Sequence, residues 1–217
     1  TVGNITTLKR HLTDFEEIRG KRINFKDVGK TLFQEFYIHL SKKENKNKKD
    51  QGLALTTVAN ILRKFKMFMS WCYDHGYLDN LNFRIYKVNS EKVDKVALTL
   101  DDIEKIKDYS PKDLREEQAL DLFLFLVSTG QRYSAAEILE WEHIDLSRKH
   151  VHFRDPKTGR LYNFYLQPLA FAIIKKYKDA DSPTPIPKIN STVLNRKIKI
   201  ILSEVGLDKT INTHLRA

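Results

Sequence analysis

The sequence predicts a mainly α-helical protein with a small β-sheet, of the α+β class: an N-terminal helical bundle, then a mixed helical domain containing a β-hairpin. Three observations predict it. Apolar residues recur at helical spacing along most of the chain, this periodicity is lost over residues 82–98, and two short alternating segments flank a turn-forming stretch near residue 157. We therefore expect two domains, residues 1–88 and residues 99–217, joined by a linker.

The composition favours a nucleic-acid partner. The chain has 217 residues, of which 41% are hydrophobic, so a buried core is expected. Lysine and arginine number 38 against 28 acidic residues, and the formal net charge of +10 should attract polyanions. Ribosomal and membrane-surface proteins share this balance, so charge alone does not decide the partner.

The chain carries one cysteine, Cys72, which excludes an intramolecular disulfide and a cysteine-rich zinc site. Its aromatic and apolar neighbours favour a small buried side chain over a reactive thiol. No apolar run is long enough to span a membrane, and the start of the sequence has no signal-peptide pattern. We expect a soluble protein of the cytoplasm, with no membrane partner.

The first domain is predicted to consist of helices at residues 6–18, 25–40 and 57–74, the last ended by Gly76. One face of the third helix is apolar, formed by Val58, Ile61, Leu62, Phe65, Phe68, Met69 and Cys72.

Basic residues of this domain are candidate DNA contacts. Residues 41–52 contain five lysines and no apolar residue, so a solvated loop and a phosphate-contacting one are equally favoured. Off the apolar stripe of the third helix lie Arg63, Lys64 and Lys66, which face either DNA or solvent. In the following segment, Lys87 is a further candidate.

The second domain is predicted to begin at Thr99, where an acid three residues later indicates a capping box. A helix at residues 116–128 is apolar nearly all round, which indicates a buried helix, and it ends at Gly130. Further helices are expected at residues 134–141, 168–178 and 191–205. Alternating strands at residues 151–154 and 162–166 enclose a turn with Lys157 near its tip.

The sequence contains no glycine-rich phosphate loop, no zinc-binding motif and no nucleophile elbow. We therefore expect neither a metal nor a nucleotide cofactor. What stands out is Arg132, held between a buried helix and the next helix, where a guanidinium can bind phosphate oxygens through two parallel hydrogen bonds. Taken alone, a structural arginine at a helix junction is the simpler interpretation.

The residues around Arg132 resemble the tyrosine recombinase, or phage integrase, family of site-specific DNA recombinases. The segment STGQRYSAAEILEWEHIDL is similar to the family pattern T-G-x-R-x-S-E-x-x-x-L-x-W-x-D-I-D. The matching residues are Thr129, Gly130, Arg132, Ser134, Leu139, Trp141, Ile144 and Asp145. By this resemblance Arg132 binds the scissile phosphate. Ala135 departs from the pattern, where an acidic residue is usual.

The hairpin supplies a second match. The family carries a lysine in a turn of the type K-T-G-K, and here PKTGRLYNFYL presents Lys157 before Thr158 and Gly159. The resemblance implies that Lys157 is the general acid that protonates the leaving 5′ oxygen. It also implies that residues 1–88 form the core-binding domain on DNA and residues 99–217 the catalytic domain.

The end of the sequence fits the family less well. The family continues with H-x-x-R-H-T-F and later a nucleophilic tyrosine, whereas His214 is followed by Arg216 after a single residue. His214 and Arg216 are the candidates for these catalytic positions. The last of the nine tyrosines is Tyr177, so no nucleophile is assigned, and the catalytic domain is expected to be incomplete here.

The resemblance implies an enzyme that cleaves and rejoins DNA through a 3′-phosphotyrosine intermediate, bound to double-stranded DNA as a homo-oligomer, a tetramer. Such an enzyme would be bacterial or phage-encoded, nucleoid-associated and part of a mobile element, and this chain by itself would be inactive. An alternative is a non-catalytic DNA-binding accessory protein on the same fold. A basic helical scaffold for RNA or protein partners explains the charge but not the two motifs together.

Overall fold

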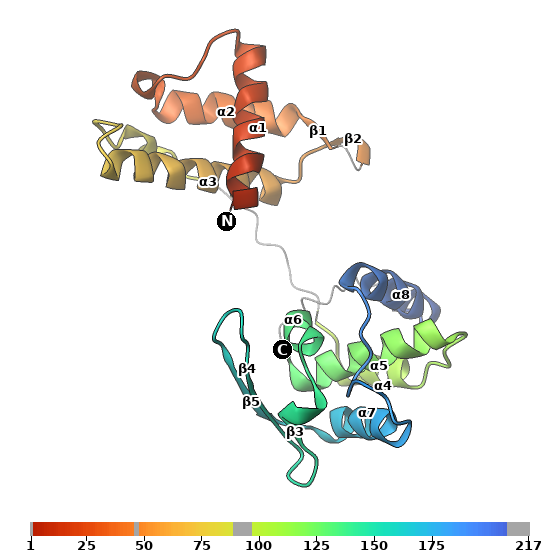
Figure 1. Cartoon of the computed structure of the whole chain (residues 1–217). Helices are drawn as coiled ribbons and strands as arrows, with labels where there is room; N and C mark the ends of the chain where they lie inside the picture. The colour runs from red at the N-terminus through yellow and green to blue at the C-terminus, as the bar shows by residue number, and fades with distance from the viewer. Residues whose placement is uncertain (1, 46–47, 89–96, 208–217) are drawn as a thin grey trace. The chain divides into compact units, whose positions relative to one another are not determined.

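The computed structural model describes residues 2–45, 48–88 and 97–207 (Figure 1). The chain divides into two compact units, Thr1–Val93 and Asp94–Ala217. Each unit has its own hydrophobic core. The boundary between the units falls within residues 82–98, the segment where the helical periodicity is lost.

The architecture is mainly α-helical with a small β-sheet, which confirms the predicted fold class. The elements of the first unit are α1 (Val2–Arg19), the 3₁₀ turn η1 (Phe25–Asp27), α2 (Lys30–Lys42), β1 (Glu44–Asn45), β2 (Lys48–Gly52), α3 (Leu55–Asp74) and η2 (Asn82–Ile85). Those of the second unit are α4 (Leu100–Lys107), α5 (Leu114–Thr129), α6 (Tyr133–Glu137), η3 (Trp141–His143), β3 (Ile144–Asp145), β4 (His150–Arg154), β5 (Leu161–Tyr165), α7 (Pro168–Asp179) and α8 (Ser191–Glu204).

In the first unit, α1, α2 and α3 pack around a core rich in phenylalanine. Phe33 of α2 and Phe65 of α3 are fully buried and stack with ring centroids 4.6 Å apart. The predicted apolar stripe of α3 is buried except for Phe68, which is 41% exposed and stacks on the exposed ring of Trp71. Cys72 is buried, as predicted, and burial raises the pKa of its thiol.

One local prediction for the first unit was wrong. The lysine-rich residues 41–52 were expected as a loop, but they contain the end of α2 and the antiparallel pair β1–β2, because strand pairing satisfies backbone groups even without apolar side chains. Helical periodicity is lost from residue 82, yet η2 belongs to the first unit. Phe83 is fully buried in the core of the first unit, and Tyr86 and Val88 pack against that core.

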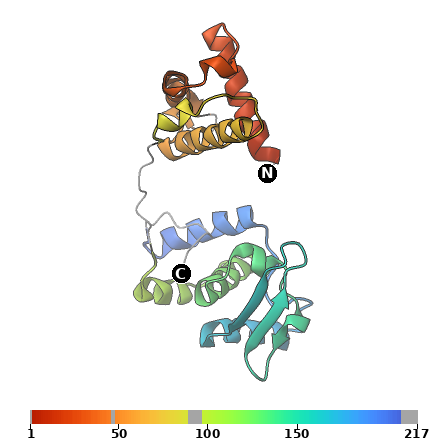
Figure 2. The same ribbon diagram turned by 90° about the vertical axis from the view of Figure 1, so that its left-hand side faces the viewer.

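In the second unit, α5 is the central element, in contact with α4, α7 and α8 (Figures 1 and 2). Nine of its residues are buried. The predicted signals at the start and end of helices are confirmed. The N–H of Asp102 donates to the Thr99 hydroxyl (3.2 Å) and the N–H of Thr99 to the Asp102 carboxylate (2.8 Å). Gly130 ends α5 in the left-handed conformation, with φ of +63°.

The sheet of the second unit has three antiparallel strands in the order β3-β4-β5. The predicted hairpin is confirmed as β4 and β5, paired from His150 with Tyr165 to Arg154 with Leu161. The sequence did not predict β3, whose two residues are too few to show alternation. The helix expected at residues 134–141 is shorter, because α6 ends at Glu137 and η3 follows.

Among the described residues, no helix is both long and apolar enough to cross a membrane. The same residues contain no group of three or more histidine, cysteine, aspartate or glutamate side chains that could hold a metal ion.

A buried histidine links α1 to the end of α2. The ring of His11 is 3.4 Å from the ammonium of Lys43, which also forms an ion pair with Asp14. Burial, then the charges of Lys43 and Arg10, lower the pKa of His11 to about 4; Asp14 acts in the opposite direction. Burial also lowers the pKa of the neighbouring His39. Both imidazoles are thus held neutral at pH values where free histidine is partly protonated.

This arrangement predicts acid sensitivity of the first unit. An unfolded chain protonates His11 below about pH 6.5, whereas the folded unit does so only near pH 4. The stability contributed by neutral His11 is complete above pH 6.5 and is lost as the pH falls toward 4. Between pH 7 and pH 5 we expect a loss of up to about 2 kcal/mol. His11→Gln should reduce this loss without abolishing it, since His39 still titrates.

The measurement is urea unfolding at pH 7 and pH 5, followed at the indole NMR signals. Trp71 reports the first unit and Trp141 the second. If the free energy of unfolding reported by Trp71 fell equally between pH 7 and pH 5 in the wild type and in His11→Gln, His11 would not cause the effect.

Candidate functional site

Arg132 lies at the junction between α5 and α6. It is the N-cap residue of α6, with extended backbone, and its carbonyl accepts the N–H groups of Ala135 (2.9 Å) and Ala136 (3.3 Å). Its side chain is exposed, and within the described residues its guanidinium has no hydrogen-bond or ion-pair partner. The backbone is therefore fixed while the charged group remains available to an anion.

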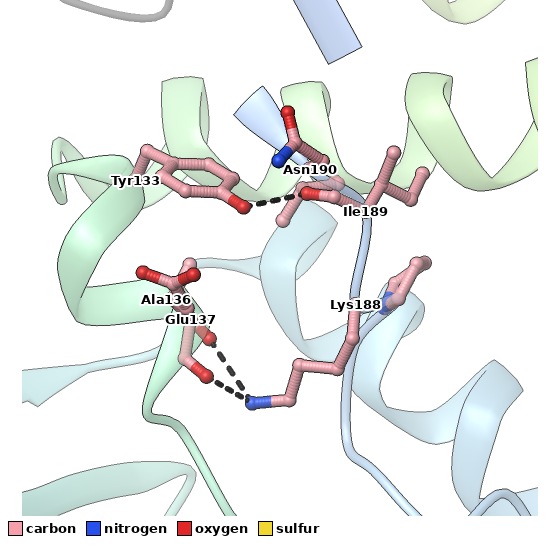
Figure 3. Close-up of a pocket in the computed structure, with 8 residues that line it drawn as sticks. Tyr133, Ala136, Glu137, Lys188, Ile189 and Asn190 are labelled. Atoms are coloured by element: carbon pink, nitrogen blue, oxygen red, sulfur yellow. Dashed lines mark hydrogen bonds between the residues drawn. The ribbon is translucent and has the colours of Figure 1, made fainter. Parts of the chain in front are cut away.

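The segment after Arg132 is tied to residues 187–190, as Figure 3 shows. The Lys188 ammonium donates to the carbonyls of Glu137 (2.6 Å) and Leu139 (2.8 Å), at the end of α6. The Tyr133 hydroxyl donates to the carbonyl of Ile189 (2.6 Å). Between the two segments lies a cavity of about 220 Å³. The Lys188 ammonium and the Tyr133 hydroxyl thus link α6 to residues 188–189.

Ala135 stands where the family pattern has an acid, and the structure shows what surrounds it. It is 3% exposed and belongs to the core of the second unit. The ammonium of Lys188 and the hydroxyl of Tyr133 provide the polar contacts that α6 makes with a distant segment. Holding the Arg132 junction therefore does not require an acid at residue 135.

Lys157 lies in the turn between β4 and β5, as predicted, and its side chain is exposed. The turn is closed by backbone hydrogen bonds from Asp155 to the Arg160 carbonyl (2.8 Å) and from Gly159 to the Asp155 carbonyl (2.8 Å). The carboxylate of Asp155 accepts the N–H of Lys157 (2.8 Å). The ammonium forms no hydrogen bond or ion pair with the residues that the structure describes, while its charge acts on the Asp155 carboxylate.

The hairpin packs against the junction that carries Arg132. Gln131 and Ala135 line a small recess together with Phe153 of β4 and Phe164 of β5. In both views the β4–β5 turn lies at the same edge of the unit as the α5–α6 junction (Figures 1 and 2). The structure therefore brings together the two segments that carry the predicted phosphate clamp and general acid.

The predicted DNA contacts of the first unit differ in their surroundings. The Lys66 ammonium donates to the carbonyls of Arg84 (3.0 Å) and Tyr86 (2.7 Å), so it holds η2 against α3. Arg63 is exposed and donates to the side chain of Asn60 (2.9 Å).

The remaining candidates of the first unit are Lys64, which is half-buried, and Lys87, which is exposed. Contact of all four basic residues with DNA stays a prediction. His214 and Arg216, the candidates at the end of the sequence, lie outside the described residues.

Sequence reasoning missed three residues that organise this region. Asp155 was part of the predicted turn, and an aspartate two residues before Lys157 is a known signal for a side chain that accepts backbone N–H groups. Lys188 and Tyr133 act on partners about 50 positions away in the sequence, so no local pattern indicates their contacts.

Comparison with known proteins finds similarity to integrases and recombinases. Residues 1–88 match the family model described as the phage integrase SAM-like domain. No curated protein matches the chain.

Solved structures match nearly the whole chain. The Tn1549 transposon integrase in complex with circular intermediate DNA is 15% identical, with a TM-score of 0.70, over 95% of this chain and 75% of the other. A lambda integrase dimer bound to a COC′ core site is 15% identical, with a TM-score of 0.65, over 94% and 73%. The XerH recombinase bound to difH is 16% identical, with a TM-score of 0.56, over 87% and 57%.

The chain has the fold of the tyrosine recombinases, and its first 88 residues match their phage integrase SAM-like domain. This confirms the resemblance that the residues around Arg132 and Lys157 predicted.

The contacts in Figure 3 predict that Lys188 stabilises the Arg132 junction. Lys188→Met keeps most of the apolar part of the side chain. It leaves the carbonyls of Glu137 and Leu139 without their charged donor and removes the ion pair with Glu140 (3.4 Å). We expect a loss of about 1–3 kcal/mol in the free energy of unfolding of the second unit, measured by urea unfolding at the Trp141 signal.

The matched control is Lys175→Met, since Lys175 of α7 is exposed and has no partner among the described residues. If both variants unfolded at the same urea concentration, the ammonium of Lys188 would have no stabilising role.

Proposed function

We propose that this chain is part of a site-specific DNA recombinase that cleaves and rejoins DNA through a 3′-phosphotyrosine intermediate. The observation that carries the proposal is the position of Arg132. Its backbone lies at the junction between the buried helix α5 and α6, its side chain is exposed, and its neighbours Gln131 and Ala135 line a recess with the hairpin that carries Lys157. The fold of recombinases solved with DNA supports it.

The proposed reaction uses these two cations differently. A tyrosine oxygen attacks the scissile phosphorus, and the bond to the 5′ oxygen breaks. Negative charge on the non-bridging oxygens is stabilised by the two-pronged contact of Arg132. Lys157 gives a proton to the departing oxygen, which leaves as a 5′ hydroxyl, and the reverse steps rejoin the strand. His214 and Arg216 complete the site in this proposal.

Two of the described tyrosines, Tyr177 and Tyr109, are poor candidates for the nucleophile. Tyr177 donates to the carboxylate of Asp121 (2.8 Å), and burial followed by this hydrogen bond raises the pKa of its phenol. Burial, then bonds to Glu204 and Glu116, likewise raises the pKa of Tyr109. A phenol that resists ionisation is a weak nucleophile. In our proposal the nucleophile is a tyrosine that is not among these 217 residues, so the chain alone does not cleave.

The partners follow from the same proposal. Residues 1–88 would hold double-stranded DNA as a core-binding domain, and residues 99–217 would form the catalytic domain. Lambda integrase has been solved as a tetramer bound to a Holliday junction, and we propose a homotetramer on DNA here. The protein would act in the cytoplasm, at the nucleoid, in the integration of a mobile element.

A second candidate function is a DNA-binding accessory protein that does not cleave. One observation favours it: Ala135 replaces the acid of the family pattern. Cleavage by the full-length protein separates the two functions.

Binding to duplex DNA should depend steeply on salt. With a net charge of +10, contacts to several phosphates release counterions, so the affinity should fall at least about 100-fold between 50 and 200 mM salt. Fluorescence anisotropy with a labelled duplex measures this. An affinity that barely changed, or a strong preference for RNA, would contradict the proposal.

Substitutions of Arg132 and of Lys157 should impair cleavage by the full-length protein in different ways. Arg132→Lys should slow cleavage at least about 100-fold, because an ammonium cannot reproduce the two-pronged contact. Lys157→Ala should slow it by a similar factor by removing the proton donor, with DNA binding largely kept. Single-turnover cleavage is measured on a normal duplex and on one whose leaving 5′ oxygen is replaced by sulfur, which needs little protonation.

The sulfur substrate is the control. It should restore cleavage by Lys157→Ala and leave Arg132→Lys slow. If it rescued neither variant, Lys157 would be an ordinary turn residue and the proposed mechanism would be wrong for this protein. If the unaltered full-length protein bound DNA and cleaved neither substrate, the accessory function would stand instead.

A further inference from the structure

The turn that carries Lys157 extends away from the core. Residues 156–160 are all exposed, and Asp155 is half-buried. Apolar packing therefore does not fix the backbone of Lys157, whereas the residues of β4 and β5 on the core side, such as Val151 and Tyr162, are held by burial. If the position of Lys157 is defined, hydrogen bonds within the turn must define it.

Those hydrogen bonds converge on Asp155. One carboxylate oxygen accepts the N–H groups of Lys157 (2.8 Å) and Thr158 (3.2 Å), and the other accepts the Thr158 hydroxyl (2.5 Å). Three donors from two successive residues thus point at one side chain. The Asp155 carboxylate therefore holds the backbone of Lys157 and Thr158, and this backbone sets the direction of the Lys157 side chain.

Two further contacts brace the same turn. Gly159 has φ of +68°, a left-handed conformation that favours glycine, and its carbonyl accepts a hydrogen bond from the Arg154 guanidinium (2.6 Å). The guanidinium of Arg160 lies over the ring of Tyr162, 5.2 Å from its centre. These contacts hold the two ends of the turn, while Asp155 alone among the described side chains bonds to the backbone N–H of Lys157.

We propose that Asp155 is the positioning residue for Lys157, holding the turn so that the lysine ammonium reaches the leaving 5′ oxygen. This inference rests on the proposed function. It assigns no proton transfer to Asp155, whose carboxylate oxygens accept hydrogen bonds from the turn. Those bonds, first the one from the Thr158 hydroxyl, hold the pKa of Asp155 below its ordinary value, so the carboxylate stays ionised at neutral pH.

The test compares Asp155→Ala and Asp155→Asn in the full-length protein on the oxygen and sulfur substrates. Asp155→Ala removes the acceptor, so cleavage of the normal duplex should slow about 10-fold or more while cleavage of the sulfur duplex stays near wild type. Asp155→Asn keeps an oxygen that can accept the N–H of Lys157. It should therefore retain cleavage of the normal duplex within about 3-fold of wild type.

The matched control lies at the other end of the sheet. Asp145 accepts the Ser147 hydroxyl (2.6 Å) and the N–H of Arg148 (3.0 Å), so it organises the turn before β4 much as Asp155 organises the turn after it. Asp145→Ala should therefore destabilise a comparable turn without affecting Lys157. Any loss of cleavage in this variant should be equal on the two substrates.

A second readout does not depend on cleavage. Amide hydrogen exchange at Lys157, measured by NMR on the present chain, should be about 10-fold faster in Asp155→Ala than in the wild type. In Asp155→Asn and Asp145→Ala it should be close to the wild-type rate.

The outcomes separate this inference from the proposed function. If Lys157→Ala is not rescued by sulfur, the proposed function fails, and the positioning role fails with it. If Lys157→Ala is rescued but Asp155→Ala cleaves like wild type, or is equally slow on both substrates, the positioning role alone is wrong. Unchanged amide exchange at Lys157 in Asp155→Ala would also overturn it.

Discussion

The second unit depends on the burial of α5. This helix is apolar on nearly every face, and its two buried carboxylates each bond to a lysine from a different helix. Glu116 pairs with Lys197 of α8 (3.1 Å), and Asp121 pairs with Lys176 of α7 (2.7 Å). A buried carboxylate without a partner would be costly, so these pairs constrain how α7 and α8 lie along α5. Apolar packing brings the helices together, and the ion pairs select one register.

The burial of α5 also restrains the candidate site, because Arg132 follows the end of this helix closely. Gly130 turns the chain out of the helix, and Arg132 opens α6 two residues later. With α5 fixed on all sides, its end can move little. The Lys188 ammonium and the Tyr133 hydroxyl then link α6 to residues 188–189, about 50 positions further along the sequence. An exposed guanidinium thus stands on a backbone that is restrained from both directions, which favours a binding group that keeps its geometry.

What the sequence predicted well was local in origin. The capping box at Thr99, the stop at Gly130 and the hairpin around Lys157 each depend on residues within a few positions of one another. The sequence failed where a distant contact decides. Phe83 is buried in the first core although it lies in the segment without helical periodicity. The contacts of Lys188 cannot be inferred from its neighbours in the sequence. The fold class was therefore predictable, whereas the supports of the site were not.

The two cations of the candidate site are held by different physical means, and the difference suits their proposed roles. The backbone of Arg132 follows directly from a buried helix, so its position is fixed by the packing of the core. Lys157 stands on an exposed turn held by the carboxylate of Asp155 and has a flexible four-carbon side chain. A phosphate clamp must hold the same atoms throughout the reaction. A proton donor has to follow an oxygen that moves away as its bond breaks, so a locally braced and otherwise free lysine is the better arrangement for it.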